Sequence, residues 1–149
     1  MDIRGFEVVS QFEDKDIALP RRKTTESAGY DIECAEAITI APGEMKLVAT
    51  GLKAFMNYDE YLAIHIRSSM AIKRHLMLVN STGIIDSDYF YSDNEGHMFS
   101  KITNDTNEEK TIDIAQGEGF MQGIFVEYGI TVDDDVTDVR NGGFGSTTK

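Results

Sequence analysis

Residues 110–115 read K-T-I-D-I-A, and this short stretch decides the fold class. Polar Thr111 and Asp113 alternate with apolar Ile112 and Ile114. Successive side chains of a β-strand point to opposite faces of a sheet, so the alternation predicts a strand with one wet face and one buried face. A strand of this kind is typical of antiparallel sheets, which pack one face on the core and leave the other in water.

Similar runs occur along the rest of the chain, separated by turn-prone sequences such as A-P-G-E, N-Y-D-E, S-D-N-E-G and Q-G-E-G. The predicted strands are residues 6–9, 38–40, 46–50, 61–66, 77–79, 98–103, 111–114 and 120–127. Only residues 68–74, S-S-M-A-I-K-R, predict a helix, of one or two turns, with Ser68 or Ser69 as its cap. Many short strands joined by tight turns predict an all-β sandwich or barrel.

Length and composition narrow the class of protein. The chain has 149 residues, of which 41% are hydrophobic and 27% charged, and these values predict one globular domain. Its 14 basic and 26 acidic residues give a net charge of −12. A surface of this sign repels nucleic-acid backbones and anionic lipids, so we expect no general nucleic-acid binding and no membrane association.

The number and spacing of the cysteine and histidine residues indicate the cellular compartment of the protein and whether it has a zinc site. Cys34 is the single cysteine, and the three histidines, His65, His75 and His97, form no metal-binding motif, so we expect no dedicated zinc site. The first residues lack the basic start and apolar stretch of a secretory signal, and no apolar run approaches the roughly 20 residues of a membrane-spanning helix. We therefore expect a cytoplasmic protein.

Two segments suit a phosphate ligand. In R-S-S, residues 67–69, the guanidinium of Arg67 and the free N–H groups of a helix start form an anion cradle, although a surface arginine beside an ordinary serine cap has the same sequence. In R-N-G-G-F-G-S-T, residues 140–147, glycines 142, 143 and 145 allow the backbone to wrap a phosphate, or they belong to a frayed end.

The segment N-S-T-G-I-I-D-S-D-Y, residues 80–89, carries candidate catalytic groups. Asp86 and Asp88 project to the same side of an extended backbone, where such a pair can supply a general base. A solvated acidic turn gives the same pattern. Tyr89 and Phe144 each offer a ring to a nucleobase or sugar, and burial at a turn is the alternative for both.

Taken in order, these segments resemble the five motifs of the trimeric dUTP diphosphatases (dUTPases). The motifs are A-G-Y-D at 28–31, R-S-S at 67–69, residues 80–89, Q-G-E-G-F-M-Q-G-I-F at 116–125 and the glycine-rich tail at 140–147. The resemblance implies an all-β, jelly-roll-like β-clip barrel that forms a homotrimer. It also implies a core at residues 1–138 and a flexible arm at 139–149, which closes the active site of another subunit.

The implied activity is the Mg²⁺-dependent hydrolysis of dUTP to dUMP and pyrophosphate, which limits uracil in DNA and supplies dUMP for thymidylate synthesis. By resemblance, Asp86 is the general base, and Asp31 holds the hydrated magnesium ion through water. The implied phosphate contacts are Arg67, Ser68, Ser69 and Gln122, joined on arm closure by Arg140, Ser146 and Thr147. The other implied substrate-binding residues are Asn80, Gly83, Ile85, Tyr89, Met98, Phe99, Phe144 and Gly145.

The resemblance also implies how the substrate is selected. Backbone amides and Asn80 pair with the uracil edge, whereas the amino group of cytosine leaves donors facing donors. Tyr89 stacks on the deoxyribose and leaves no room for a 2′-hydroxyl, and Phe144 covers the uracil. Uracil and deoxyribose are therefore expected to be read separately.

The sequence departs from the family pattern at several positions. Gly119 stands where a large residue is usual, Met121 stands where alanine is usual, and residues 90–97 lengthen the hairpin of the third motif. In the tail, Arg140 is one residue closer to Phe144 than in many members, and Thr148 replaces a common glycine.

Two other functions stay open on the sequence. A dCTP deaminase shares the implied fold and needs a different catalytic constellation, including a glutamate base. A phage-type regulator uses the same trimer and arm to bind a regulatory protein partner, and the acidic tip of residues 90–97 favours this alternative.

Overall fold

The computed structural model describes residues 3–141 and confirms the predicted all-β class. The strands are β1 (Gly5–Val8), β2 (Arg21–Arg22), β3 (Tyr30–Glu33), β4 (Ile38–Ile40), β5 (Met45–Ala49), β6 (Leu52–Phe55), β7 (Glu60–Ile66), β8 (Leu76–Leu78), β9 (Gly83–Asp86), β10 (Phe99–Asn104), β11 (Ile112–Ile114) and β12 (Gly119–Glu127). The helical elements are α1 (Ser68–Arg74) and the short 3₁₀ turns η1 (Ser10–Phe12) and η2 (Ser87–Tyr91).

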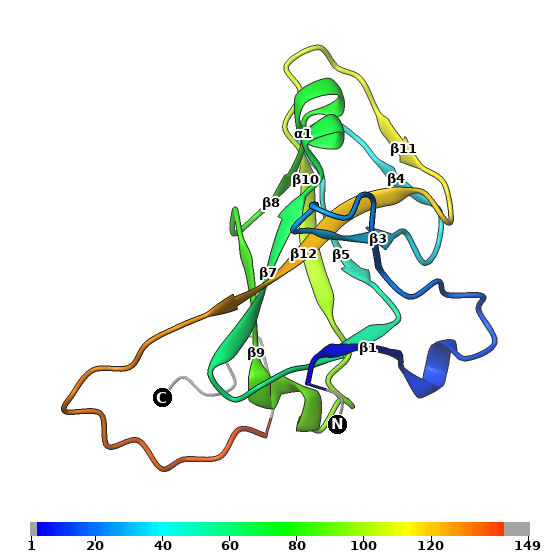
Figure 1. The fold of residues 1–149 in the computed structure, drawn as a ribbon. Helices are drawn as coiled ribbons and strands as arrows, with labels where there is room; N and C mark the ends of the chain where they lie inside the picture. The colour runs from blue at the N-terminus through cyan, green and yellow to red at the C-terminus, as the bar shows by residue number, and fades with distance from the viewer. Residues whose placement is uncertain (1–2, 142–149) are drawn as a thin grey trace.

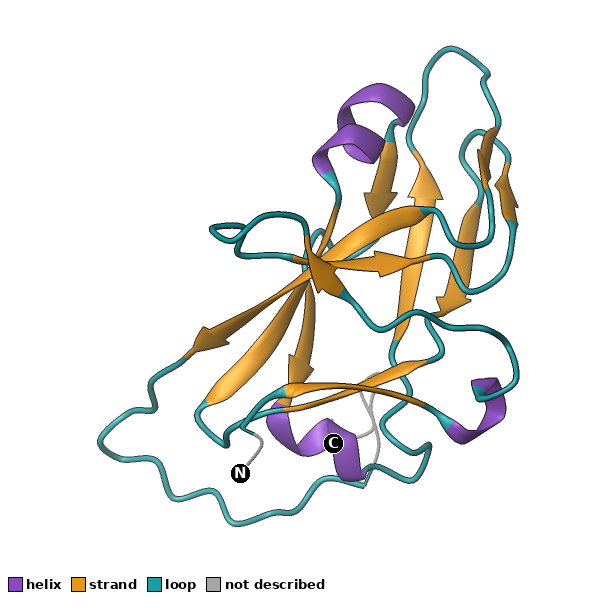
Figure 2. Cartoon of the chain, turned by 45° about the vertical axis from the view of Figure 1, so that its right-hand side comes forward, coloured by secondary structure: helices purple, strands orange, loops and turns teal. Residues whose placement is uncertain are grey.

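The strands form four antiparallel sheets within residues 3–141. The largest has the order β2-β3-β12-β7-β9, and a three-stranded sheet has the order β5-β10-β8. Strands β4 and β11 form one two-stranded sheet, and β1 and β6 form the other. Figures 1 and 2 show β7 and β12 running through the middle of the molecule, with α1 at the upper end and η2 at the lower end.

Most of the predicted elements are present. The stretch at 110–115 contains β11, where Ile112 and Ile114 are buried and Asp113 is exposed, as its alternation predicts. Helix α1 has the predicted bounds. The predicted serine cap is wrong, because Arg67 occupies the N-cap position without a side-chain cap hydrogen bond. Four strands were not predicted, namely β2, β3, β6 and β9.

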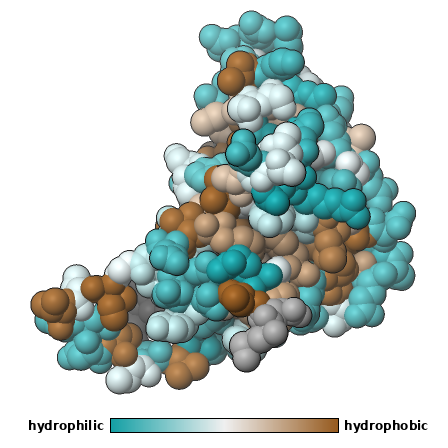
Figure 3. All heavy atoms as spheres, in the orientation of Figure 1, coloured by the Kyte–Doolittle hydropathy of each residue, from teal (hydrophilic) through white to brown (hydrophobic). Residues whose placement is uncertain are grey.

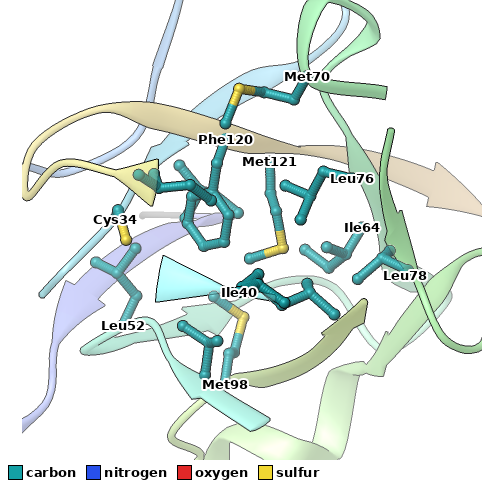
Figure 4. Packing of buried hydrophobic residues seen from close by; sticks show 14 of the residues in the cluster. Cys34, Ile40, Leu52, Ile64, Met70, Leu76, Leu78, Met98, Phe120 and Met121 are labelled. Carbon is teal, nitrogen blue, oxygen red and sulfur yellow. The ribbon is translucent and has the colours of Figure 1, made fainter. Parts of the chain in front are cut away.

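One hydrophobic core joins the sheets, and β12 supplies its centre (Figure 4). Phe120 and Met121 are consecutive and both buried, whereas successive side chains of a regular strand point to opposite faces. The pairing with β3 shifts register between Gly119 and Met121, so Phe120 is the extra residue of a β-bulge. Burial of a side chain of this size contributes roughly 1.5–3 kcal/mol to stability.

The chain leaves the core after β12 and continues without strand or helix through residues 128–141, the C-terminal segment. The last strand therefore ends at Glu127, before the predicted boundary at residue 138. Ile130, Val132, Val136 and Val139 are exposed along this segment, which Figure 3 shows at lower left. None of the helices in residues 3–141 is long and apolar enough to cross a membrane.

Candidate active site

A pocket beside β9, here called the hairpin pocket, brings together most residues of the third predicted motif. Its lining residues are Asn80, Gly83, Ile84, Ile85, Asp86, Tyr89, Phe99 and Arg140. Strand β9 pairs with β7 from Gly83 opposite Ile64 to Asp86 opposite Tyr61. A β-carbon on Gly83 would lie 3.0 Å from the Cβ of Ile64, so glycine permits the close pairing that carries Asp86 to the pocket. Of the lining residues, only Ile84 was not predicted.

The two acidic residues of this motif converge on one arginine. Arg140 Nη2 donates a hydrogen bond to Asp86 Oδ2 at 2.5 Å, and its Nε donates to Asp88 Oδ1 at 2.8 Å. The two carboxylates thus meet at one arginine, although Asp88 lies in the 3₁₀ turn η2 and not on the extended backbone that the sequence predicts. About half of each aspartate side chain is exposed, whereas the Arg140 side chain is largely buried. In this arrangement, Arg140 is hydrogen-bonded to Asp86, the predicted general base. The phosphate contact predicted for Arg140 stays a prediction.

Tyr89 is the buried wall of the hairpin pocket. It is only 6% exposed, and its hydroxyl donates a hydrogen bond to the carbonyl oxygen of His97 at 2.6 Å. Phe99 also lines the pocket. Met98 does not, because its side chain belongs to the core and its backbone N–H donates to the carbonyl of Leu52. Of these two predicted substrate contacts, only Phe99 lines the pocket within the described residues, and the contact of each with the substrate stays a prediction.

A second depression, here called the Arg67 groove, collects the first, second and fourth motifs. Its lining residues are Lys23, Ser27, Ala28, Gly29, Asp31, Arg67, Ser68, Ser69, Gln122 and Ile124. Asp31 on β3 stands opposite Gln122 on β12 in the sheet register. Arg67, directly after β7, places its Nε 3.6 Å from Asp31 Oδ1. Three neighbouring strands therefore deliver the predicted phosphate-binding groups to one place.

The bulge in β12 determines which residues face the groove. Because Phe120 is the extra residue, Met121 enters the core opposite Ile32 and Gln122 falls beside Asp31. The carbonyl of Phe120 accepts a hydrogen bond from the backbone N–H of Arg67 at 3.1 Å, which fixes the start of α1. The large side chain at position 121, a departure from the family pattern, fills the core and does not obstruct the groove.

The structure also explains why a glycine occupies position 119. The guanidinium of Arg67 donates from Nη1 to the carbonyl of Gly119 at 3.1 Å. A β-carbon at position 119 would lie 2.5 Å from that same nitrogen. The glycine at this departure from the family pattern therefore leaves room for the guanidinium at the position where it faces Asp31. Gly29 plays a similar part, because a β-carbon there would lie 2.2 Å from Gln122 Oε1.

The sequence-based prediction missed several residues of the groove. Lys23 and Ser27 line it, and they come from the loop between β2 and β3. The basic run R-R-K at 21–23, just before the first motif, was the available signal. Four predicted contacts, Phe144, Gly145, Ser146 and Thr147, lie outside the described residues and stay predictions.

Comparison with known proteins gives one consistent result. The family model described as dUTPase matches residues 15–148. A deoxyuridine 5′-triphosphate nucleotidohydrolase of Lactococcus lactis subsp. lactis (strain IL1403) is 49% identical over 150 residues, covering 99% of this chain and 99% of the relative.

Solved structures agree with the sequence relatives. A dUTPase from Streptococcus mutans is 40% identical with a TM-score of 0.77, and the match covers 85% of this chain and 98% of that one. A mutant dUTPase from phage phi11 of S. aureus, whose structure concerns the coordination of a structural Mg(II) ion, has a TM-score of 0.72. That match covers 92% of this chain and 98% of the phage protein, and at 19% identity it shows likeness of fold alone. With the family match over residues 15–148 and the full-length relative, this chain belongs to the dUTPase family.

Proposed function

We propose that this protein hydrolyses dUTP to dUMP and pyrophosphate. Family membership supports the proposal, and the observation that carries it is the place of Asp86 in the lining of the hairpin pocket, together with Asn80 and Tyr89. A pocket that binds the base and sugar next to a carboxylate presents the α-phosphate to a general base. Asp86 would take the proton of the attacking water, a role worth roughly 10²- to 10⁴-fold in rate.

The base would be read by the backbone of β9. Within residues 3–141, this strand is the last in the five-stranded sheet and pairs with β7 along one side only. On the other side, the backbone N–H and C=O groups of an edge strand point away from the sheet and can pair with an added edge. The uracil edge carries a hydrogen-bond donor between two acceptors. The free edge of a strand offers the N–H and C=O groups that can pair with them. Asn80, which lines the same pocket, would add a further hydrogen bond to the uracil edge.

The Arg67 groove would hold the phosphates. Arg67 supplies a guanidinium fork for phosphate oxygens, and Ser68, Ser69 and Gln122 supply neutral donors beside it. Lys23 adds a second positive charge to the groove. These cations offset the net charge of −12 at the point where a triphosphate must bind.

The donor set suits a magnesium ion that is bound mainly through water and phosphate. Within residues 3–141, no group of three histidine, cysteine, aspartate or glutamate side chains could hold a metal ion. Asp31 presents one carboxylate to the groove. Mg²⁺ keeps several water ligands and commonly uses one or two carboxylates together with substrate phosphates, so this single carboxylate fits. The bound ion would neutralise phosphate charge, while Asp31 would position its water shell.

The two halves of the site are too far apart to serve one nucleotide within one chain. Asp86 stands opposite Tyr61 near the start of β7, whereas Arg67 follows the end of that strand. Tyr61 and Arg67 are six residues apart, which corresponds to about 20 Å of strand. Figures 1 and 2 agree, because α1 and η2 lie at opposite ends of the molecule. We infer that the hairpin pocket of one subunit faces the Arg67 groove of another.

Exposed apolar surface supports such an assembly, for which we propose the homotrimer. Met45 and Leu47 of β5 and Met77 of β8 are exposed on the three-stranded sheet, followed by Val79. The C-terminal segment exposes further apolar side chains with no strand partner within residues 3–141 (Figure 3). A second and third copy of the chain would bury both surfaces. A closed ring of three identical subunits makes each interface equivalent.

Pyrophosphate release from purified protein, measured separately with dUTP, dCTP, dTTP and UTP and Mg²⁺, tests the proposal. We expect rapid release from dUTP alone. Ammonia release from dCTP would instead support the deaminase alternative. Pull-down of a protein partner that depends on dUTP, in the absence of hydrolysis, would support the regulatory alternative.

A further inference from the structure

Residues 92–97, here called the brace turn, belong to the lengthened segment at 90–97 and contact Tyr89 from two sides. The Tyr89 hydroxyl donates its proton to the carbonyl oxygen of His97 at 2.6 Å and accepts a hydrogen bond from Asn94 Nδ2 at 2.8 Å. A phenol has one proton, so the hydroxyl has no second donor for a ligand. Tyr89 therefore presents its ring, and no hydroxyl donor, to a sugar in the hairpin pocket.

The orientation of the Asn94 amide is fixed by the backbone of the same turn. Asn94 Oδ1 accepts a hydrogen bond from the N–H of Gly96 at 3.1 Å, which leaves the NH₂ group facing Tyr89. Gly96 has a φ of +74°, and a β-carbon there would lie 2.7 Å from backbone atoms of Phe90. Glycine is thus required at this position, and it lets the turn close tightly under the tyrosine.

The brace turn is itself attached to distant parts of the fold. The Glu95 carboxylate accepts hydrogen bonds from the N–H of Ser10 at 3.0 Å and its hydroxyl at 2.8 Å, and it pairs with Lys53 Nζ at 3.2 Å. The Ser10 hydrogen bonds hold the pKa of Glu95 below its usual value. At the other end, His97 Nε2 accepts from the N–H of Gly51 at 2.9 Å. These anchors restrain both ends of the turn.

We propose that Asn94 is a positioning residue that determines sugar specificity by holding the ring of Tyr89 in place. The inference rests on the proposed function, in which Tyr89 packs on the deoxyribose. A ring excludes a 2′-hydroxyl only if it cannot move aside, and the hydrogen bonds from the brace turn supply that restraint. The lengthened segment therefore serves the enzyme's own specificity, and its acidic residue Glu95 is engaged within the chain.

A double-mutant cycle between Asn94→Asp and Tyr89→Phe tests the proposal. Asn94→Asp keeps the acceptor for Gly96 and nearly the same volume, but it replaces the donor facing Tyr89 by an acceptor. The measured quantity is the ratio of kcat/KM for dUTP to kcat/KM for UTP. Both nucleotides carry the same triphosphate, so an electrostatic effect of the new carboxylate cancels in the ratio.

We expect each single variant to lower this ratio by roughly 3- to 10-fold, the effect of one neutral hydrogen bond. The double variant should lower it no further, because Asn94 acts through the Tyr89 hydroxyl. Asp93→Asn is the matched control: it lies in the same turn, its side chain has no hydrogen bond or ion pair within residues 3–141, and the ratio should not change.

An unchanged ratio in Asn94→Asp, or additive effects in the double variant, would overturn the proposal. Tyr89→Ala separates this failure from a failure of the proposed function. If Tyr89→Ala relaxes sugar discrimination while Asn94→Asp does not, the positioning role alone is wrong. If Tyr89→Ala keeps full discrimination between dUTP and UTP, the proposed sugar contact of Tyr89 is wrong, and the proposed role of Asn94 is wrong as well.

Discussion

Arg67 and Asp86 lie at opposite ends of strand β7, one after its last residue and the other opposite Tyr61. Each lines a different pocket, and the two pockets together contain the groups that a nucleoside triphosphate needs. Under the proposed function, the hairpin pocket of one copy of the chain and the Arg67 groove of another form one site. This arrangement makes subunit mixing an informative experiment.

Mixing two inactive variants should restore activity. Arg67→Ala damages the groove and Asp86→Asn damages the hairpin pocket, so in mixed trimers some interfaces combine an intact groove with an intact pocket. After joint denaturation and refolding of a 1:1 mixture, random assembly gives about a quarter of the wild-type activity in a symmetric trimer. Pyrophosphate release measures the recovery, and the same mixture without subunit exchange is the control. No recovery after confirmed exchange would place each complete site within one chain.

Asp86→Asn should separate binding from chemistry. Asparagine is nearly isosteric with aspartate and can still accept a hydrogen bond from Arg140, so the pocket and the affinity for dUTP should be preserved. The loss of the general base should lower kcat by at least ~10²-fold. Single-turnover rates and equilibrium binding of dUTP provide the two measurements. Near-normal turnover would remove Asp86 from the role of general base.

The sequence predicted those strands and helices whose own residues show a clear local pattern. The alternation at 110–115 identified β11, because it reflects burial on one face. S-S-M-A-I-K-R identified α1 with its bounds, although Met70 is the one buried residue of that helix. Strands β3 and β9 were missed because A-G-Y-D and T-G-I-I-D combine turn-forming residues with only a few apolar ones. Both are strands because they pair with long neighbours, β12 and β7, and this pairing is not visible locally.

The sequence predicted which motifs form the candidate site, but it did not predict how their side chains are arranged in space. The resemblance supplied Asp86, Tyr89 and Arg67, and the structure places them in two pockets. The bulge at Phe120 sets the side to which Gln122 points, and a one-residue register shift has no signal in composition or periodicity. The contact of Asn94 with Tyr89 depends on the tight turn at Gly96, so only the three-dimensional structure reveals it.

Gly119→Ala should weaken phosphate binding with little effect on folding. The added methyl group would lie 2.5 Å from Arg67 Nη1, the far end of a flexible side chain, so the guanidinium should move away from Asp31. We expect KM for dUTP to rise by roughly 10-fold, the effect of one charge-assisted hydrogen bond, with a smaller change in kcat. Gly129→Ala is the matched control, because its added methyl would meet no atom of residues 3–141 within 4 Å. Equal KM values in the two variants would contradict the role of Gly119.

His97 should make stability depend on pH below neutrality. Burial lowers the pKa of His97 below its ordinary value, although Glu95 opposes the effect, and its Nε2 accepts a hydrogen bond from the N–H of Gly51. The unfolded chain therefore binds the proton more readily than the folded chain, so stability is complete above the ordinary histidine pKa of about 6.5 and is lost as pH falls through the folded value.

Thermal unfolding of wild type and His97→Gln at pH 7.5, 6.5 and 5.5 provides the test. The wild-type midpoint should fall over this range, and the variant should show a smaller fall because glutamine does not titrate. His65 and His75 are common to both proteins, so the difference between the two curves reports His97. Parallel curves would show that protonation of His97 is not coupled to unfolding.

Deletion of residues 140–149 should abolish most activity and leave the assembly intact. The last strand of the described residues ends at Glu127, so within residues 3–141 the truncation removes no strand and no buried core residue. It does remove Arg140, which contacts Asp86 and Asp88, together with the predicted phosphate and uracil contacts at 144–147.

The truncated protein should keep its mass by light scattering while pyrophosphate release from dUTP falls by at least ~10²-fold, since a closing segment both positions the substrate and excludes water. The full-length Arg140→Gln variant isolates the guanidinium from the rest of the arm. We expect it to lose activity through a higher KM, because the remaining arm contacts are kept. Full activity of the truncated protein would contradict the role of the arm, and dissociation into monomers would show that residues 140–149 hold the subunits together.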